Sequence, residues 1–213
     1  IMIIAAAPGG VTTNVMTKFA NGDVALSISL TAIISLISII SVPFIVLKSA
    51  DLLGVTNISA DITMTAITLK MALVVTVPVI LGMIIRKFAD DLISSNLSIV
   101  NKITTALFVI VFAAIWIEER ENIFNYLKQA GFAVLVLNVV MMTLAYYIAK
   151  FFATGMKQRK CIAIECGLQN GTLAVFVATQ MFNDIAYMIP TAAYALIMYL
   201  TGFALIFILR RAN

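Results

Sequence analysis

The sequence predicts an all-α membrane protein that crosses the bilayer several times and contains two interrupted helices. Hydrophobic residues make up 62% of the chain and charged residues 11%, whereas a soluble domain is about half apolar and about a quarter charged. The charges gather in short clusters between apolar runs of about 20 residues, the length that spans a bilayer. Two of these runs carry glycine and amide residues in their middle. These features exclude a water-soluble globule.

Apolar runs divide the chain into seven segments. The first is a half-span near 1–20, and it begins Ile-Met-Ile-Ile with no initiator Met and no leading basic segment, which indicates a start inside a helix rather than a signal peptide. The runs that follow are each long enough to cross a membrane. They lie near 23–47, 66–86, 97–117, 130–153, 160–182 and 187–209.

The first and the sixth segments are predicted to be broken helices. Residues 8–14 read Pro-Gly-Gly-Val-Thr-Thr-Asn, and residues 165–172 read Glu-Cys-Gly-Leu-Gln-Asn-Gly-Thr. Proline, glycine and amides interrupt a helix, and a break at membrane depth is tolerated only where protein or a polar cavity surrounds the freed backbone groups. Both breaks are therefore expected in the protein interior.

The distribution of lysine and arginine predicts the orientation in the membrane. One set of loops and span ends holds ten bases and the opposite set holds four, Lys48, Lys70, Arg120 and Lys128. Basic loops stay in the cytoplasm, so the ten-base set, and with it the C-terminus, is predicted to be cytoplasmic. The ten bases are Lys18, Arg86, Lys87, Lys102, Lys150, Lys157, Arg159, Lys160, Arg210 and Arg211. They form no continuous stripe, so no nucleic-acid partner is expected.

The order of whole and broken spans predicts an internal repeat. From about residue 66 onward there are five spans, of which the fourth is broken and the fifth is whole, and the chain before that point also ends with a broken span and a whole one. An odd number of spans inverts the second copy. The sequence thus predicts two five-helix units in opposite orientation, ten spans in all, with roughly three and a half helices before Ile1.

Glu165 is the acidic residue that lies deep in an apolar span. A bare carboxylate there costs several kcal/mol, so it requires a cation, a proton or hydration. Gly167, Gln169 and Asn170 follow it and can unwind the helix, which would turn carbonyl and amide oxygens toward the carboxylate and create a site for a hard cation. Two simpler interpretations remain open, namely a protonated packing glutamate and a plain helix kink.

Polar side chains near the first break predict two further features. Thr12, Thr13 and Asn14 stand where a half-helix would start, and its unpaired N–H groups favour an anion. In the next span Ser27, Thr31 and Ser35 recur every four residues and so share one helix face. Such a stripe can also be a packing seam in which hydroxyls bond back to carbonyls.

These two motifs together resemble the bile acid:sodium symporter family, including its bacterial members. Residues 8–16 are similar to that family's fourth-helix crossover and residues 163–170 to its ninth, and the helix pattern matches over the whole chain. The resemblance implies a ten-helix inverted repeat with panel and core domains, and two broken helices that cross in the core. Residues 1–50 would hold the second half of helix 4 and helix 5 (core), 66–117 helices 6 and 7 (panel), and 121–211 helices 8 to 10 (core).

The resemblance also implies two sodium sites and a substrate site. The first sodium site would comprise Thr13, Asn14, Ser27, Thr31 and Glu165. The second would comprise Glu165, the backbone oxygens of Cys166 and Leu168, and Gln169, together with a glutamine on a helix that precedes this chain. Thr12 and Asn170 would contact the substrate.

The function expected from the resemblance is sodium-coupled symport of a small organic anion, either bile acid-like or another carboxylate such as pantoate, across a bacterial inner membrane. The alternative is a proton- or sodium-driven antiporter or efflux carrier of the same architecture, in which Glu165 would exchange protons. An intramembrane enzyme is disfavoured because the chain has no histidine and no pair of intramembrane acids. A purely structural subunit would not need two broken helices.

Overall fold

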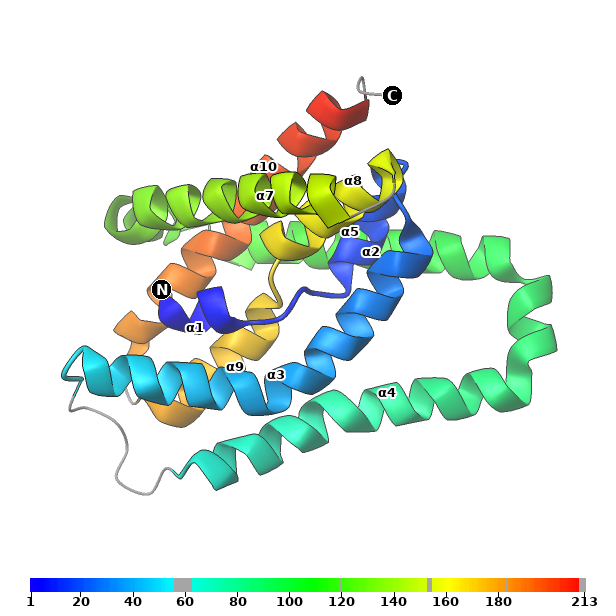
Figure 1. The fold of residues 1–213 in the computed structure, drawn as a ribbon. Coiled ribbons are helices and arrows are strands. Elements are labelled where there is room, and N and C mark those ends of the chain that lie inside the picture. The colour runs from blue at the N-terminus through cyan, green and yellow to red at the C-terminus, as the bar shows by residue number, and fades with distance from the viewer. Residues whose placement is uncertain (56–62, 119, 153–154, 183, 211–213) are drawn as a thin grey trace.

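The computed structural model describes residues 1–55, 63–118, 120–152, 155–182 and 184–210, and helices make up most of these ranges. Residue 211, the predicted end of the third unit, and residue 153, the predicted end of one span, lie outside the described residues. Figure 1 shows the helices, which are α1 (Met2–Ala6), α2 (Thr12–Phe19), α3 (Val24–Leu52), α4 (Met64–Ser95), α5 (Leu97–Glu118), α6 (Ile123–Tyr126), α7 (Phe132–Phe152), α8 (Met156–Gly167), α9 (Gly171–Met181) and α10 (Ile189–Arg210). A π-helical turn, η1 (Leu127–Gly131), joins α6 to α7, and a 3₁₀ turn, η2 (Ile185–Tyr187), precedes α10.

Four helical stretches of the described chain are long and apolar enough to cross a membrane. They are Val24–Leu52, Met64–Ser95, Phe124–Phe152 and Ile189–Arg210. Many of their large apolar side chains face outward, for example Ile40, Met83 and Phe151, as lipid-facing residues do. The prediction of an all-α, multi-pass membrane protein is confirmed.

The two longest helices each contain a proline, and α4 also contains a kink. α3 contains Pro43 and α4 contains Pro78, and a proline inside a helix removes one backbone hydrogen bond and crowds the preceding turn. α4 also leaves helical geometry at Ala89 (φ −128°, ψ 25°). Figure 1 shows both helices changing direction along their length.

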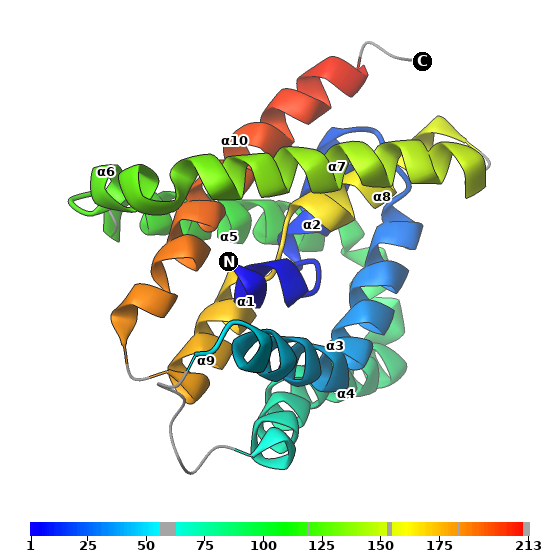
Figure 2. The same ribbon diagram turned by 60° about the vertical axis from the view of Figure 1, so that its left-hand side comes forward.

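Both predicted breaks are present, and the chain segments at the breaks cross. Residues 7–11 separate α1 from α2, and residues 168–170 separate α8 from α9. Gly9 and Gln169 form an antiparallel bridge. The Gly10 N–H donates to the Leu168 carbonyl (3.1 Å), and the Asn170 N–H donates to the Pro8 carbonyl (2.7 Å). The two connections cross near the middle of the molecule in both views (Figures 1 and 2).

The apolar core surrounds this crossing. α8 packs against α7, α3 and α2, and α10 contacts α7, α9 and α2. Met16, Ile164 and Leu168, which are fully buried, lie in this core with Tyr194 of α10. α4 and α5 lie to one side, where α4 packs on α3 and α5 contacts α2. The crossing is therefore enclosed by helices from both ends of the chain.

Candidate functional site

The turn between α2 and α3 positions the hydroxyl residues of the site. Asn21 follows the end of α2 with a positive φ of 54°, a conformation in which asparagine often ends helices. Asp23 then caps α3, since its Oδ1 accepts a hydrogen bond from the Leu26 N–H (3.0 Å). This cap sets the start of α3, so that Ser27 and Thr31, four residues apart, face α2 and α8.

The carboxylate of Glu165 lies among hydroxyl groups from α2 and α3. Thr13 Oγ1 and Ser27 Oγ each lie 2.5 Å from Glu165 Oε1. Thr31 Oγ1 lies 3.1 Å from both carboxylate oxygens and 3.3 Å from Thr13 Oγ1. Glu165 is 8% exposed, and Thr13 and Ser27 are 0% exposed. The structure thus brings together four residues predicted for the first sodium site, and Asn14 joins them through Ser27.

In this cluster the hydrogen-bond acceptor oxygens outnumber the hydroxyl hydrogens that are available to them. Ser27 Oγ has one hydrogen and two acceptor neighbours, the carboxylate and Asn14 Oδ1 (2.8 Å). Thr13 Oγ1 likewise faces the Gly10 carbonyl (2.7 Å) as well as the carboxylate. A hydroxyl donates only one hydrogen bond. Such a cluster suits a bound cation or a carboxyl group that carries a proton.

Protein cations do not neutralise Glu165 within the described ranges. The ion pairs found there are Arg86–Asp90 and Arg120–Glu121, both on exposed side chains. Lys160, the base in the same segment, is buried but forms no ion pair with Glu165 in the part of the chain that the structure describes. Among the described residues, the carboxylate thus has hydroxyl partners and no cationic one.

Gly9 allows the first break to approach Glu165 closely. A Cβ atom at this position would lie 2.6 Å from Glu165 Oε2 and 3.1 Å from the Glu165 carbonyl oxygen. Real Cβ contacts are longer than the first of these distances. Glycine is therefore needed here for the backbone to pass beside the carboxylate.

The residues predicted for the second sodium site lie at the other break. The Gln169 side-chain N–H donates to the Cys166 carbonyl (3.0 Å), and the Leu168 carbonyl accepts from Gly10. Gln169 Oε1 is buried and has no hydrogen-bond partner among the described residues. Buried polar atoms are normally satisfied, so this orphaned oxygen fits a ligand role.

Asn138 and Tyr194 belong to the same region, and the sequence reasoning missed them. Asn138 is 0% exposed, and its side-chain N–H₂ donates to the Gly167 carbonyl (2.6 Å) and toward the Tyr194 hydroxyl (3.0 Å). The Tyr194 hydroxyl also donates to the Gly167 carbonyl (2.9 Å). Both side chains thus contact the last residue of α8, where the helix ends. The signal that could have revealed Asn138 is an amide inside an apolar span.

The two predicted substrate residues stand at helix starts. Thr12 is the first residue of α2. Asn170 is the N-cap of α9, and its Oδ1 accepts from the Leu173 N–H (3.0 Å), the usual role of asparagine at this position. Ser35, the last member of the predicted stripe, is not part of the cluster, and its carbonyl accepts a bond from Ser38.

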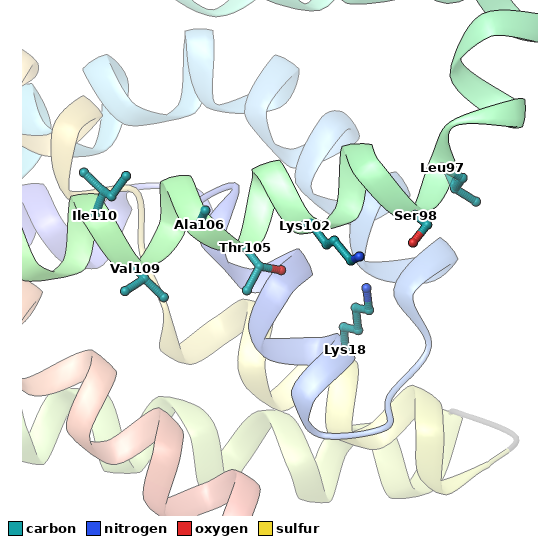
Figure 3. A pocket seen from close by; sticks show the side chains of 8 residues that line it. All are labelled: Lys18, Leu97, Ser98, Lys102, Thr105, Ala106, Val109 and Ile110. Atoms are coloured by element: carbon teal, nitrogen blue, oxygen red, sulfur yellow. The ribbon is translucent and has the colours of Figure 1, made fainter.

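A cavity lies between α2 and α5, apart from the cluster around Glu165. Its volume is ≈ 920 Å³. Figure 3 shows its lining, which is Lys18, Leu97, Ser98, Lys102, Thr105, Ala106, Val109 and Ile110. Neither Glu165 nor the predicted substrate residues line it.

Membrane-spanning helices around two crossed helix breaks, with a buried carboxylate at the crossing, define the class of a multi-pass transport protein. The chain belongs to the sodium bile acid symporter family, whose model matches residues 1–126. The family's name describes its members as symporters, which are transporters and not enzymes.

Similar proteins are named as sodium-dependent transporters. Over 207 residues the chain is 28% identical to the uncharacterized sodium-dependent transporter YocS of Bacillus subtilis (strain 168), covering 95% of this chain and 61% of that protein. It is 26% identical over 214 residues to the probable chloroplastic sodium/metabolite cotransporter BASS1 of Arabidopsis thaliana, covering 100% of this chain and 51% of the relative. A rice protein of the same description, BASS2, is 26% identical over 205 residues, 96% of this chain and 48% of the relative. The chain spans about half to three-fifths of the length of these relatives.

Proposed function

We propose that the chain forms the C-terminal part of a sodium-coupled symporter of a small organic anion. The observation that carries this proposal is the burial of Glu165 among the hydroxyls of Thr13, Ser27 and Thr31. Family membership and the printed names of the relatives agree with sodium use.

The first sodium ion is proposed to bind between Glu165 and the oxygens of Thr13, Asn14, Ser27 and Thr31. Carboxylate, hydroxyl and amide oxygens are the ligands that hard cations prefer. The cluster already has more oxygen acceptors than hydrogens, and so a monovalent cation would supply the missing positive charge. A fixed negative charge is needed because neutral oxygens alone compensate the desolvation of a buried ion poorly.

A second sodium ion is proposed at the break between α8 and α9. Its ligands would be Glu165, the carbonyl oxygens of Cys166 and Leu168, and Gln169. Support comes from the Gln169 Oε1 atom, which is buried without a partner in the described chain. A glutamine on a helix that precedes Ile1 would complete this site. Both sites would then share one carboxylate.

The substrate anion is proposed to bind at Thr12 and Asn170, where α2 and α9 begin. Helix starts present N–H groups and the positive end of the helix dipole. Because sodium would hold the two breaks together, it would also hold these two helix starts in position. Anion binding and sodium binding would thereby favour the same conformation, which is the requirement for coupling.

The complete protein is proposed to be a ten-helix inverted repeat in a bacterial inner membrane, with a cytoplasmic C-terminus. Residues 1–50 and 121–211 would belong to a core domain and residues 66–117 to a panel domain. The packing of α2 and α3 on α8, with α4 and α5 to one side, supports this division. Transport would require movement of the core relative to the panel.

The test is the thermal stability of the full-length protein against sodium concentration, for the wild type and for Glu165→Gln, at two pH values. A ligand that binds the folded state raises its melting temperature. We expect sodium to stabilise the wild type, and Glu165→Gln, which keeps size but removes the charge, to lose most of this shift. Persistence of the full sodium-induced shift in the variant would overturn the shared-carboxylate proposal.

Two controls sharpen this experiment. Glu121→Gln removes the same charge from a side chain that is 82% exposed, and it should leave the sodium response unchanged. Potassium should not substitute for sodium in the wild type. The proton-driven form of the antiporter alternative predicts that the melting temperature depends on pH, that Glu165→Gln abolishes this dependence, and that sodium has little effect at fixed pH.

A further inference from the structure

Two lysines from different helices line the cavity between α2 and α5. Lys18 lies in the last turn of α2, and Lys102 lies near the start of α5. Figure 3 shows their amino groups pointing toward one another across the cavity, with Ser98 on the same side. Both side chains are exposed, and two positive charges that face the same cavity give it a positive potential that attracts anions.

Neither lysine is neutralised by the part of the chain that the structure describes. Its ion pairs are Arg86–Asp90 and Arg120–Glu121, and the cavity lining includes no acidic residue. The helix dipole favours a cation in the last turn of α2, which accounts for Lys18 but not for Lys102. The pair therefore favours an anion from outside the described residues.

The rest of the lining fits a small organic molecule. Beyond the lysines, α5 presents Thr105, Ala106, Val109 and Ile110 along the cavity (Figure 3). Ligand sites are typically about 300–1,000 Å³ in volume, with apolar walls and a few polar groups that orient the ligand. The volume of ≈ 920 Å³ lies within this range.

We infer that Lys18 and Lys102 form a subsite for a small organic dianion, such as a dicarboxylate. Two ammonium groups match two negative charges, whereas a monoanion would leave one lysine without a counter-charge. The subsite is separate from Thr12 and Asn170, which do not line the cavity. It rests on the proposed function and extends it by adding a second point, apart from Thr12 and Asn170, at which a transported dianion would bind.

The position of Lys18 also connects the subsite to the cluster of hydroxyls around Glu165, because both include residues of α2. Lys18 and Thr13 share α2 and are separated by about 7 Å along the helix axis, at 1.5 Å per residue. A dianion at the lysine pair and a cation at Glu165 would thus both hold α2 in place. Sodium is expected to tighten dianion binding.

The test uses the purified full-length protein with succinate and butyrate, which have the same number of carbons and differ in charge. Binding is measured as the shift in melting temperature at low ionic strength, with and without sodium. We expect succinate to stabilise the wild type at concentrations at least about tenfold below those needed for butyrate. Lys18→Gln and Lys102→Gln should each weaken the succinate response about tenfold or more, since each substitution removes one of the two positive charges that face the dianion.

Matched variants separate charge from structure. Lys18→Arg and Lys102→Arg keep the charge and should retain most of the succinate response, and Lys150→Gln removes an exposed lysine of α7 and should change nothing. Sodium-induced stabilisation without succinate should survive in both Lys→Gln variants, so that loss of this subsite is distinct from failure of the sodium proposal. Equal responses to succinate and butyrate would overturn the inference. So would Lys→Gln variants that lose thermal stability without any anion and keep the succinate response, because the lysines would then pair with carboxylates of the protein itself.

Discussion

The Glu165 carboxylate contacts hydroxyls that lie 134 to 152 positions earlier in the chain. Each hydroxyl can be assigned its own contribution to sodium binding. Thr13 belongs to α2, whereas Ser27 and Thr31 belong to α3. Hydrogen bonds to a charged group contribute about 1.5–3 kcal/mol each. Single hydroxyl deletions should therefore weaken the site measurably and leave the fold intact.

Thr31→Ala and Ser27→Ala in the full-length protein should raise the sodium concentration for half-maximal stabilisation by about tenfold each. The measurement is melting temperature against sodium concentration. Ser38→Ala is the matched control, since Ser38 is a buried hydroxyl of the same helix that donates to the Ser35 carbonyl (2.6 Å) instead. If both test variants kept the wild-type sodium response, the hydroxyl stripe that contains Ser27 and Thr31 would serve only in helix packing.

Gly9→Ala should disturb the site without removing any ligand. The added Cβ would lie 2.6 Å from a carboxylate oxygen that hydroxyls hold in place, and overpacking of this kind costs about 1–3 kcal/mol. We expect a lower melting temperature and a sodium response weakened as much as by loss of a hydroxyl. Gly10→Ala is the control, because its Cβ would lie 3.4 Å from the nearest atom, an ordinary contact. Equal effects of the two substitutions would contradict the close approach at Gly9.

At the scale of the helices, sequence reasoning was successful where local chemistry decides the structure. Glycine and proline at 8–10 and glycine and amides at 167–171 predicted both breaks, and charges and apolar runs predicted most spans. Span ends were less accurate, since α4 continues to Ser95 although its apolar run ends near residue 86. Residues 87–95 include three charged side chains, and apolar patterning does not reveal a helix that continues beyond the membrane.

The contacts that support the second break were not predictable in the same way. Tyr194 lies in an apolar span and is 1% exposed, and nothing in its local sequence separates it from a packing residue. Its partners, Asn138 and Gly167, lie on other helices. Such a triplet depends on how three helices pack, which spacing along one helix does not specify.

Asn138→Ala should lower the stability of the full-length protein by about 1–3 kcal/mol, because the Gly167 carbonyl would lose a buried donor. Tyr194→Phe should have a smaller effect, since Asn138 would still donate to that carbonyl. Melting temperatures without sodium provide the measurement, and Tyr147→Phe, at a ring that is 55% exposed, is the control. If Asn138→Ala melted like the wild type, the triplet would not stabilise the end of α8.

At the scale of the whole molecule, the two breaks should respond as one unit. Gly10 and Asn170 donate backbone hydrogen bonds across the crossing in opposite directions, so neither break can open without affecting the other. Sodium should therefore slow amide hydrogen exchange in peptides that contain residues 8–14 and in peptides that contain 165–172. Mass spectrometry of the full-length protein measures both.

Two comparisons complete the exchange experiment. Glu165→Gln should remove the sodium-dependent protection at both breaks, and peptides from the middle of α4, away from the crossing, should show no sodium dependence in either protein. Protection confined to a single break would show that the two segments open independently.

Because the two breaks cross, the site around Glu165 can form only after both breaks have been synthesised. A ribosome completes Thr13, Ser27 and Thr31 long before it reaches Glu165, and contacts between such distant residues form only after the intervening chain has been made. Until then the glycine-rich segment at 8–10 lacks its partner strand at 168–170 and has exposed N–H and C=O groups. In hydrocarbon such groups are costly, so this segment is expected to stay out of hydrocarbon until residues 168–170 have been made. The segment from α8 onward is therefore expected to complete the arrangement of α2 and α3 around Glu165.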